Sequence, residues 1–270
     1  MGRPIDVRFQ GRERVICCYE VDGVLVDPGP ASSVENLLAQ LDSEPRALLL
    51  THIHLDHAGA TGVLVRRFPD LQVYVHERGA AHVVDPTKLL ASASRLYGDQ
   101  MERLWGEVAP VPERNVHALA GGERVEGFDV LYTRGHANHH VTYIDRAGGD
   151  AYVGDMAGVR IPPSDYTLAP TVPPEFDAEA WRESMQRIEA AGPASLNLTH
   201  FGRVDDVPGQ FQRVRGWLER FAGEPAETEA EWFARLQEDI EGHSDSATAE
   251  AFAEAAPPHT LYPGIVRYWS

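Results

Sequence analysis

The chain has 270 residues, and 24 Lys and Arg against 41 Asp and Glu give a formal net charge of −17. A hydrophobic fraction of 43% and a charged fraction of 24% are typical of globular domains and exclude a disordered, collagen-like or coiled-coil chain. Because nucleic-acid binding requires clustered Lys and Arg, and the longest basic cluster is Arg66-Arg67, we expect no nucleic-acid partner. No window approaches the roughly 20 apolar residues of a membrane span, and residues 1–11 do not read as a signal peptide, so we expect a cytoplasmic protein without a membrane partner.

The first half of the chain predicts alternating strands and helices. Residues 19–27 predict the second arm of a β-hairpin or a pair of short strands, because Asp22-Gly23 is a favoured two-residue turn between apolar runs. The elements predicted next are a helix from Ser32 or Ser33 to Leu41, a buried strand over 47–50, a helix over 58–68 and a strand over 71–75. This succession is typical of a layered α/β fold. Cys17 and Cys18 are adjacent on a predicted strand and point to opposite faces, which excludes a disulfide between them.

Apolar residues recur at helical spacing within 86–108 and predict one or two helices there. We favour a helical insertion that packs on the core over a lid that lines a pocket. The elements predicted afterwards are short strands over 124–155, a proline-rich loop over 161–174, a helix over 178–191, a strand over 195–198 and helices beyond 207. The last part is therefore expected to be a helical appendage on one domain.

The most informative segment is Thr51-His52-Ile53-His54-Leu55-Asp56-His57, which follows the predicted buried strand and opens a helix. In extended backbone His52 and His54 project to the same side, so both imidazoles can bind one metal ion. Asp56 and His57 come where the chain turns into the helix, so they can face a second ion. A lone histidine could serve only the core and Asp56 could serve only as a helix cap, but four such residues together indicate a metal site.

Further polar side chains stand at later junctions between strands and loops. His136 precedes one predicted strand, Asp155 ends the next, and His200 ends the last. Layered α/β folds place their functional residues on loops of this kind. These three residues are therefore candidates to complete the metal site.

With these motifs the sequence resembles the metallo-β-lactamase superfamily of metal-dependent hydrolases. The resemblance covers about Cys18 to Gly202, and its motifs occur in order: Val26-Asp27-Pro28-Gly29, Thr51 to His57, Gly135-His136 with His140, Gly154-Asp155, and His200. It implies an αββα sandwich, two mixed sheets face to face with outer helices and a site along one edge. We accordingly divide the chain into a domain of this fold over 1–204 and a C-terminal helical extension over 205–270.

The resemblance also implies roles for individual residues. The ligand roles are His52, His54 and His136 for a first metal, Asp56, His57 and His200 for a second, and Asp155 as the bridging carboxylate. His140 matches a position near the site and is assigned with Asp56 as a catalytic residue, where we expect contact with a metal ligand or the substrate, or else plain packing. Asp27 resembles a buried carboxylate that supports the metal-binding loops, although it could instead stabilise the turn before Pro28.

The remaining candidates lie outside these motifs. His139 departs from the small residue common at its position and is expected to face solvent. Arg160 and Tyr166, on the loop after Asp155, are candidate substrate contacts. The five histidines expected to have no role in the site are His76, His82, His117, His243 and His259.

Nitrogen and oxygen donors without cysteine favour two zinc ions, and iron or manganese would also bind them. A hydroxide held between two cations needs no nucleophilic side chain, and Asp56 beside it could carry the proton. We expect hydrolysis of a small ester, thioester or lactone first and of a phosphodiester second. Two alternatives are an oxidoreductase resembling the persulfide dioxygenases, which use one iron, and a non-catalytic metal-binding protein.

Overall fold

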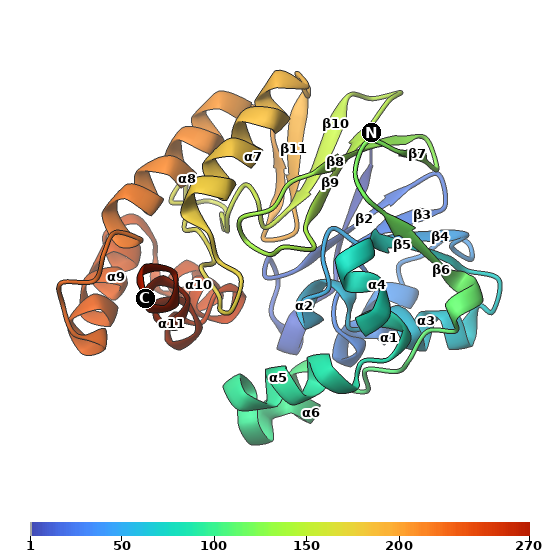
Figure 1. The fold of residues 1–270 in the computed structure, drawn as a ribbon, viewed down its shortest axis with the longest axis horizontal. Helices are drawn as coiled ribbons and strands as arrows, with labels where there is room; N and C mark the ends of the chain where they lie inside the picture. The colour runs from blue at the N-terminus through green and yellow to red at the C-terminus, as the bar shows by residue number, and fades with distance from the viewer. Residues whose placement is uncertain (1) are drawn as a thin grey trace.

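Two six-stranded sheets pack face to face and form the centre of the molecule (Figure 1). The computed structural model describes residues 2–270. In spatial order the strands of the first sheet are β1 (Arg3–Asp6), β2 (Cys17–Val21), β3 (Val24–Val26), β4 (Ala47–Leu49), β5 (Gln72–His76) and β6 (Val116–Leu119). Those of the second are β12 (Gly202–Val204), β11 (Ser195–Leu198), β10 (Asp150–Gly154), β9 (Val141–Asp145), β8 (Phe128–Tyr132) and β7 (Arg124–Val125). Each sheet therefore comes from one continuous stretch of the chain.

Both sheets are mixed. β3 to β6 run parallel to one another, and so do β10 and β11, whereas the other neighbours are antiparallel. The predicted hairpin is confirmed as β2 and β3. Its turn residues Asp22 and Gly23 have φ values of 48° and 77°, and two positive φ angles are what this class of tight turn requires.

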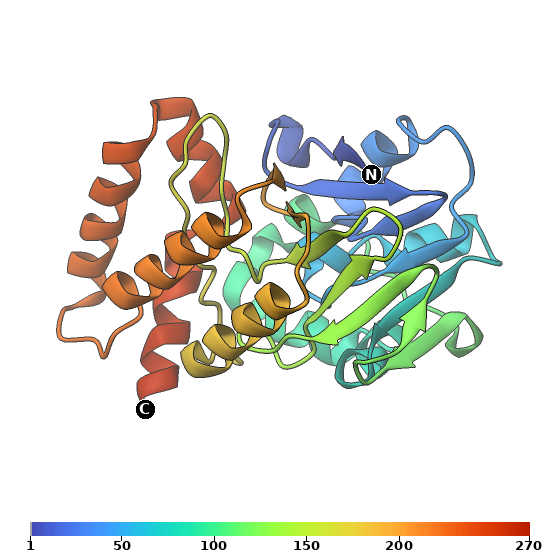
Figure 2. The ribbon, with the colours of Figure 1, turned by 90° about the horizontal axis from the view of Figure 1, so that it is seen from above.

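Helices cover the outer faces of both sheets (Figures 1 and 2). On the first sheet these are α1 (Val34–Leu38), α2 (Leu55–Ala58), α3 (Thr61–Arg67) and α4 (Glu77–Val84), and on the second α7 (Ala178–Ala190) and α8 (Val207–Phe221). Short 3-10 turns occur at Phe9–Gly11, Ala31–Ser33, Gly98–Gln100 and Glu113–Asn115. The αββα sandwich predicted from the sequence is confirmed, and its helices differ in detail. The helix predicted from 32 or 33 to 41 is shorter, and the one predicted over 58–68 corresponds to α3, which begins only at Thr61 after the separate one-turn helix α2.

The strand β4 shows why the centre of the sandwich is apolar on both sides. Ala47 and Leu49 belong to the core between the sheets, and Leu48 belongs to the core beneath the outer helices. Successive side chains of a strand point to opposite faces, so a strand buried on both faces is a continuous apolar run. The loop that carries the histidine motif begins directly after this fixed strand.

Two further groups of helices stand at one edge of the sandwich (Figures 1 and 2). One consists of α5 (Thr87–Tyr97) and α6 (Met101–Trp105), and the other of α9 (Glu229–His243), α10 (Ser246–Ala255) and α11 (Pro258–Trp269). One apolar core continues from the sheets through Phe211 of α8 to Leu236 of α9 and Leu261 of α11, so the division at residue 204 stays a prediction. Across residues 2–270 every helix is too short or too polar to traverse a bilayer.

Candidate metal centre

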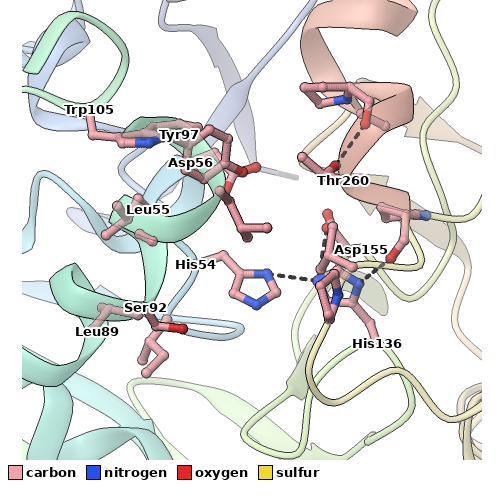
Figure 3. Close-up of a pocket in the computed structure, with 18 of the residues that line it drawn as sticks. His54, Leu55, Asp56, Leu89, Ser92, Tyr97, Trp105, His136, Asp155 and Thr260 are labelled. Atoms are coloured by element: carbon pink, nitrogen blue, oxygen red, sulfur yellow. Dashed lines mark hydrogen bonds and ion pairs between the residues drawn. The ribbon is translucent and has the colours of Figure 1, made fainter. Parts of the chain in front are cut away.

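All seven predicted metal ligands stand at one edge of the two sheets, and Figure 3 shows four of them, His54, Asp56, His136 and Asp155. The loop after β4 carries His52 and His54, and the first turn of α2 carries Asp56 and His57. The loop between β8 and β9 carries His136, while Asp155 and His200 directly follow β10 and β11. Because β10 and β11 are parallel, their carboxyl ends lie side by side, and the polar residues that follow them meet.

The first set of donors consists of His52, His54, His136 and Asp155, each offering one ligand atom within 4.8 Å of the others. His54 Nδ1 lies 3.0 Å from His52 Nε2 and 2.9 Å from His136 Nε2. His136 Nε2 lies 3.2 Å from Oδ2 of Asp155. Three imidazole nitrogens and one carboxylate oxygen thus surround a single small space.

The second set consists of Asp56, His57 and His200, again with ligand atoms within 4.8 Å of one another. His200 Nε2 lies 3.3 Å from Oδ2 of Asp56, and His57 Nε2 lies 3.7 Å from the same oxygen. Oδ1 of Asp155 lies 3.1 Å from His57 Nε2 and 3.5 Å from His200 Nε2. Asp155 therefore turns one oxygen to each set.

Hydrogen bonds on the far side of each ring fix which nitrogen presents a lone pair. His136 Nδ1 donates to the carbonyl oxygen of Pro170 at 2.8 Å, and His200 Nδ1 donates to that of Val15 at 2.7 Å. A carbonyl oxygen can only accept, so the proton resides on Nδ1. In the neutral rings Nε2 then carries the lone pair. A hydrogen bond from the other ring nitrogen is what commonly orients histidine ligands of metals.

Asp27 organises the loops behind the site. Its Oδ1 accepts from the Thr51 amide at 2.8 Å. Its Oδ2 accepts from the Thr51 hydroxyl at 2.6 Å, the Thr199 hydroxyl at 2.9 Å and His57 Nδ1 at 2.8 Å. The carboxylate is completely buried and joins the loop after β4 to the loop after β11. Of its two predicted roles, the geometry matches support of the metal-binding loops.

The electrostatics divide the site into two parts. Burial lowers the pKa of His52 and His54, and it lowers that of His136 to about 3. For His57 and His200 burial acts in the same direction, but Asp155 and the other nearby carboxylates outweigh it and raise both pKa values. The imidazoles of the first set therefore lose their protons at a lower pH than those of the second set.

The two carboxylates are ionised. Burial alone would favour their neutral forms, but His57 and neighbouring imidazoles outweigh it, lowering the pKa of Asp56 to about 2 and that of Asp155 well below its ordinary value. Asp56 keeps 21% of its side chain exposed and lines the cavity described below. An ionised carboxylate that reaches solvent can bind a cation and accept a hydrogen bond from water.

Several buried polar atoms of the site have no hydrogen-bond partner: Nε2 of His57, Nε2 of His200 and Oδ1 of Asp155. An unsatisfied buried polar group costs about 1–3 kcal/mol. A cation placed among them would satisfy all three at once. The residues present therefore fit two divalent metal ions.

His140, predicted as a catalytic or neighbouring residue, lies behind the site. Its Nδ1 is 2.9 Å from the Thr133 hydroxyl, and its ring stacks on His52 with centroids 5.2 Å apart. A side chain in place of Gly154, whose φ is 47°, would put its Cβ 2.8 Å from His140 Nε2. His140 is completely buried and outside the cavity lining, so its geometry is that of a positioning residue and not of a substrate contact.

The two predicted substrate contacts are also displaced from the cavity. Tyr166 is buried, stacks on His243 and contacts the Phe252 ring edge to face. Arg160 forms an ion pair with Asp165. Neither lines the cavity, because the loop after Asp155 turns beneath the C-terminal helices, a course that local sequence does not encode.

One prediction about the other histidines is wrong. His139 is buried instead of facing solvent, with Nδ1 3.4 Å from the Ile53 amide and Nε2 3.4 Å from Glu175. His82 lines the cavity but belongs to neither donor set, and the expectation that it has no role in the site stays a prediction. The neighbours of His139, among them His52, Ile53 and Glu175, come from distant segments, which explains why its burial could not be predicted from the motif.

A cavity of about 360 Å³ opens above the donors, with His54, Asp56, Asp155 and His200 in its lining. One wall is formed by α5 and α6, and the opposite wall by residues 170–175 and 254–260 (Figure 3). The segment 86–108 packs on the core, as the sequence favoured, through Ala93 and Trp105, and it also lines a pocket, as the alternative expected. In α5 only Ala93 is buried, because the apolar stripe of this helix faces the cavity.

The sequence reading missed four residues of this cavity, namely Arg78, Lys88, Tyr97 and Trp105. They belong to α4, α5 and α6, which contain no recognisable motif. Two signals were available: the apolar spacing over 86–108, which also allowed a lid that lines a pocket, and composition, since Lys88 is the only lysine in the sequence.

An αββα sandwich with two adjoining His/Asp donor sets at one edge defines a protein built to hold divalent metals. Residues 15–200 match the model of the metallo-beta-lactamase superfamily, and the chain therefore belongs to that superfamily. Members of this superfamily bind divalent metals, and they are largely hydrolases.

Individual relatives agree with this assignment. A metallo-beta-lactamase fold-containing protein of Sulfurisphaera tokodaii, ST1585, is 27% identical over 70% of this chain and 72% of its own. The crystal structure of ST1585 superposes with a TM-score of 0.71 at 21% identity, covering 98% of this chain and 97% of that one. TTHA1623, solved in a di-iron-bound form, superposes with a TM-score of 0.53 at 27% identity over 76% and 92% of the two chains.

A hydroxyacylglutathione hydrolase of Thermosynechococcus vestitus is 30% identical to this chain over 131 residues. That alignment covers 48% of this chain and 42% of the relative. The chain thus matches less than half the length of this relative.

Proposed function

We propose that the protein is a hydrolase that uses two divalent metal ions to cleave a small-molecule ester, thioester or lactone. One observation carries the proposal: the two donor sets adjoin at the floor of the cavity, and Asp155 lies 3.2 Å from His136 through one oxygen and 3.1 Å from His57 through the other. A carboxylate between two sets of imidazoles suits a pair of cations that share it.

The donors are nitrogen and oxygen atoms without cysteine, so zinc is the proposed metal, and iron or manganese also suits them. The di-iron form of TTHA1623 supports iron as the alternative. Metal ions bound here would lower the pKa of a water from 15.7 to about 7 and so supply hydroxide at neutral pH.

The residues of the chain have separate tasks in this reaction. Hydrolysis adds water to the acyl carbon, breaks the carbon–oxygen or carbon–sulfur bond, and transfers a proton to the departing alcohol or thiol. Asp56 is ionised and reaches the cavity, so it can accept the proton of the water and pass it to the departing atom. Asp27 holds His57 in one orientation throughout.

Three other functions remain as outcomes of the experiment: a phosphodiesterase, an iron oxidoreductase with one metal, and a non-catalytic metal-binding protein. The complete second set of Asp56, His57 and His200 favours two metals over one. Relatives named hydroxyacylglutathione hydrolases favour acyl over phosphoryl substrates.

The test is elemental analysis of the purified protein together with a hydrolysis panel of thioesters, lactones, phosphodiesters and β-lactams. We expect two metal equivalents per chain and turnover of an acyl substrate. His200→Ala should lose about one equivalent and most activity, whereas His117→Ala, at an exposed histidine of β6, should keep both. One iron per chain with oxygen uptake on glutathione persulfide, or two metals without turnover of any acyl or phosphoryl substrate, would displace the proposal.

A further inference from the structure

The cavity has two chemically different ends, and α5 connects them. Lys88 stands in the first turn of α5 and Tyr97 is its last residue, and both line the cavity. At 1.5 Å per residue they are about 14 Å apart along the helix. The metal donors lie between these ends: in Figure 3 Leu89 and Ser92 stand on one side of His54, and Tyr97 and Trp105 stand on the side of Asp56.

The first end is cationic. Arg78 and His82 are one turn apart on the same face of α4, and Lys88 follows at the start of α5. All three line the cavity. Within residues 2–270, neither Arg78 nor Lys88 has a carboxylate within ion-pair distance. Glu175 and Glu254 also line the cavity but pair with His139 and Arg12, so Arg78 and Lys88, both exposed, remain available to an anion.

The second end is apolar and aromatic. The Trp105 ring stacks on Phe9 with centroids 5.7 Å apart and meets Tyr97 edge to face at 5.0 Å. Leu96 and Leu104 extend the same wall. These rings are held by one another, so this end offers a preformed surface for an apolar group.

We propose that the cavity binds an ester or thioester with an anionic group on one side of the scissile bond and an apolar group on the other. Arg78 and Lys88 hold the anion, and Tyr97 and Trp105 hold the apolar group. The inference rests on the proposed function, because the metal donors between the two ends place the scissile bond. A volume of about 360 Å³ limits the substrate to a small molecule.

The first test measures binding without turnover and uses the fact that Lys88 is the only lysine. The zinc-loaded protein is reductively methylated in the presence of octanoate, octyl phosphate or 1-octanol, and modification of Lys88 is followed by mass spectrometry. We expect octanoate, octyl phosphate or both to slow the modification at least tenfold, and octanol to leave it unchanged. If only octanoate protects, the recognised anion is a carboxylate; if only octyl phosphate protects, it is a phosphate. Equal effects of all three probes, or no protection by any, would overturn the anion site.

The second test measures selectivity. Mono(p-nitrophenyl) adipate and its methyl ester differ only in the carboxylate, and the ratio of their kcat/KM values reports its recognition. Lys88→Gln and Arg78→Gln should each lower this ratio at least tenfold. Arg95→Gln makes the same change of charge at an exposed position of α5 outside the cavity lining and should leave the ratio unchanged. An unchanged ratio in both cavity variants refutes the assignment.

The apolar end is tested by alkyl carboxylates of increasing length. Each added CH₂ should tighten binding about fourfold until the wall is covered. The inference and the proposed function fail differently. Protection of Lys88 without hydrolysis of any ester would contradict the function and keep the anion site. Equal hydrolysis of both adipate esters without protection would keep the function and reject the anion site.

Discussion

Asp27→Asn tests whether the buried carboxylate behind the site controls metal binding. Oδ2 of Asp27 accepts three hydrogen bonds, from two hydroxyls and His57 Nδ1, and Oδ1 accepts one from the Thr51 amide. An asparagine amide placed at Oδ2 would face the N–H of His57. With the side-chain amide turned the other way, its NH₂ group would face the backbone N–H of Thr51. That N–H can only donate a hydrogen bond, so the two donors would oppose each other. The first orientation is the one the site can adapt to, because hydroxyls rotate and histidine can move its proton.

The adaptation has a defined consequence. If His57 accepts at Nδ1, its proton must move to Nε2, the atom that faces Asp155 at 3.1 Å. His57 then has no lone pair for the second metal. Loss of such a supporting contact weakens metal binding by about 10–100-fold, or about 1.4–2.8 kcal/mol. The lost charge-assisted hydrogen bonds should lower the free energy of unfolding by about 1.5–3 kcal/mol.

The assay is a zinc titration against a competing chelator that resolves the first and second equivalents, accompanied by urea unfolding. We expect a 10–100-fold weaker second equivalent. Asp150→Asn is the matched control, because Asp150 is equally buried and accepts from Ser195 and Arg203 at the opposite end of β10. The control should lose stability and keep both affinities. An unchanged second affinity in Asp27→Asn would refute the reasoning.

Three more outcomes follow from the structure. The pKa values of His57 and His200 are raised and those of the first-set imidazoles are lowered, so binding the second zinc should release more protons than binding the first and should strengthen with pH. Calorimetry in two buffers measures the release, and equal release by both equivalents would contradict this expectation. Burial raises the pKa of Cys17 to about 12, so both cysteines should resist thiol reagents until the protein unfolds, and rapid labelling of the native protein would disprove this. Gly62→Ala should lower the free energy of unfolding by about 1–3 kcal/mol, because its Cβ would lie 1.9 Å from a backbone oxygen, whereas Gly216→Ala, in open space on α8, should raise it by about 0.5–1 kcal/mol. Urea unfolding of both variants measures the difference, and equal effects would contradict the packing described here.

The parts of the fold that local pattern determines were predictable from the sequence. The β2–β3 hairpin follows from Asp22-Gly23, and β4 follows from a short apolar run that stays buried on both faces. The edge strand β1 is only four residues long and half exposed, so its sequence carries no alternation to detect. The alternation of apolar and polar residues reflects burial of one face, and an edge strand buries few side chains.

In the candidate site, too, local sequence determines some residues and tertiary packing determines others. The seven donors lie in dense motifs next to strand ends, so residue types and spacing suffice to find them. Arg160 and Tyr166 were chosen by their distance along the chain from Asp155, yet contacts with the C-terminal helices turn Tyr166 away from the cavity. Lys88 and Trp105 reach the cavity only through the path of α5 and α6. Where such a segment docks depends on tertiary packing, which local sequence does not specify.

The donors come from both sheets, and this couples metal binding to assembly of the whole sandwich. His52, His54, Asp56 and His57 belong to the N-terminal half, and the C-terminal half supplies the remaining donors. Neither half alone carries a complete set, so ions bound between them act as cross-links that only the docked state can use. Metal at a hundredfold excess over its dissociation constant adds about 2.7 kcal/mol per site to the native state. Removal of the metals by a chelator should therefore first weaken the interface between the two halves. The supply of metal during synthesis would govern how much folded protein accumulates.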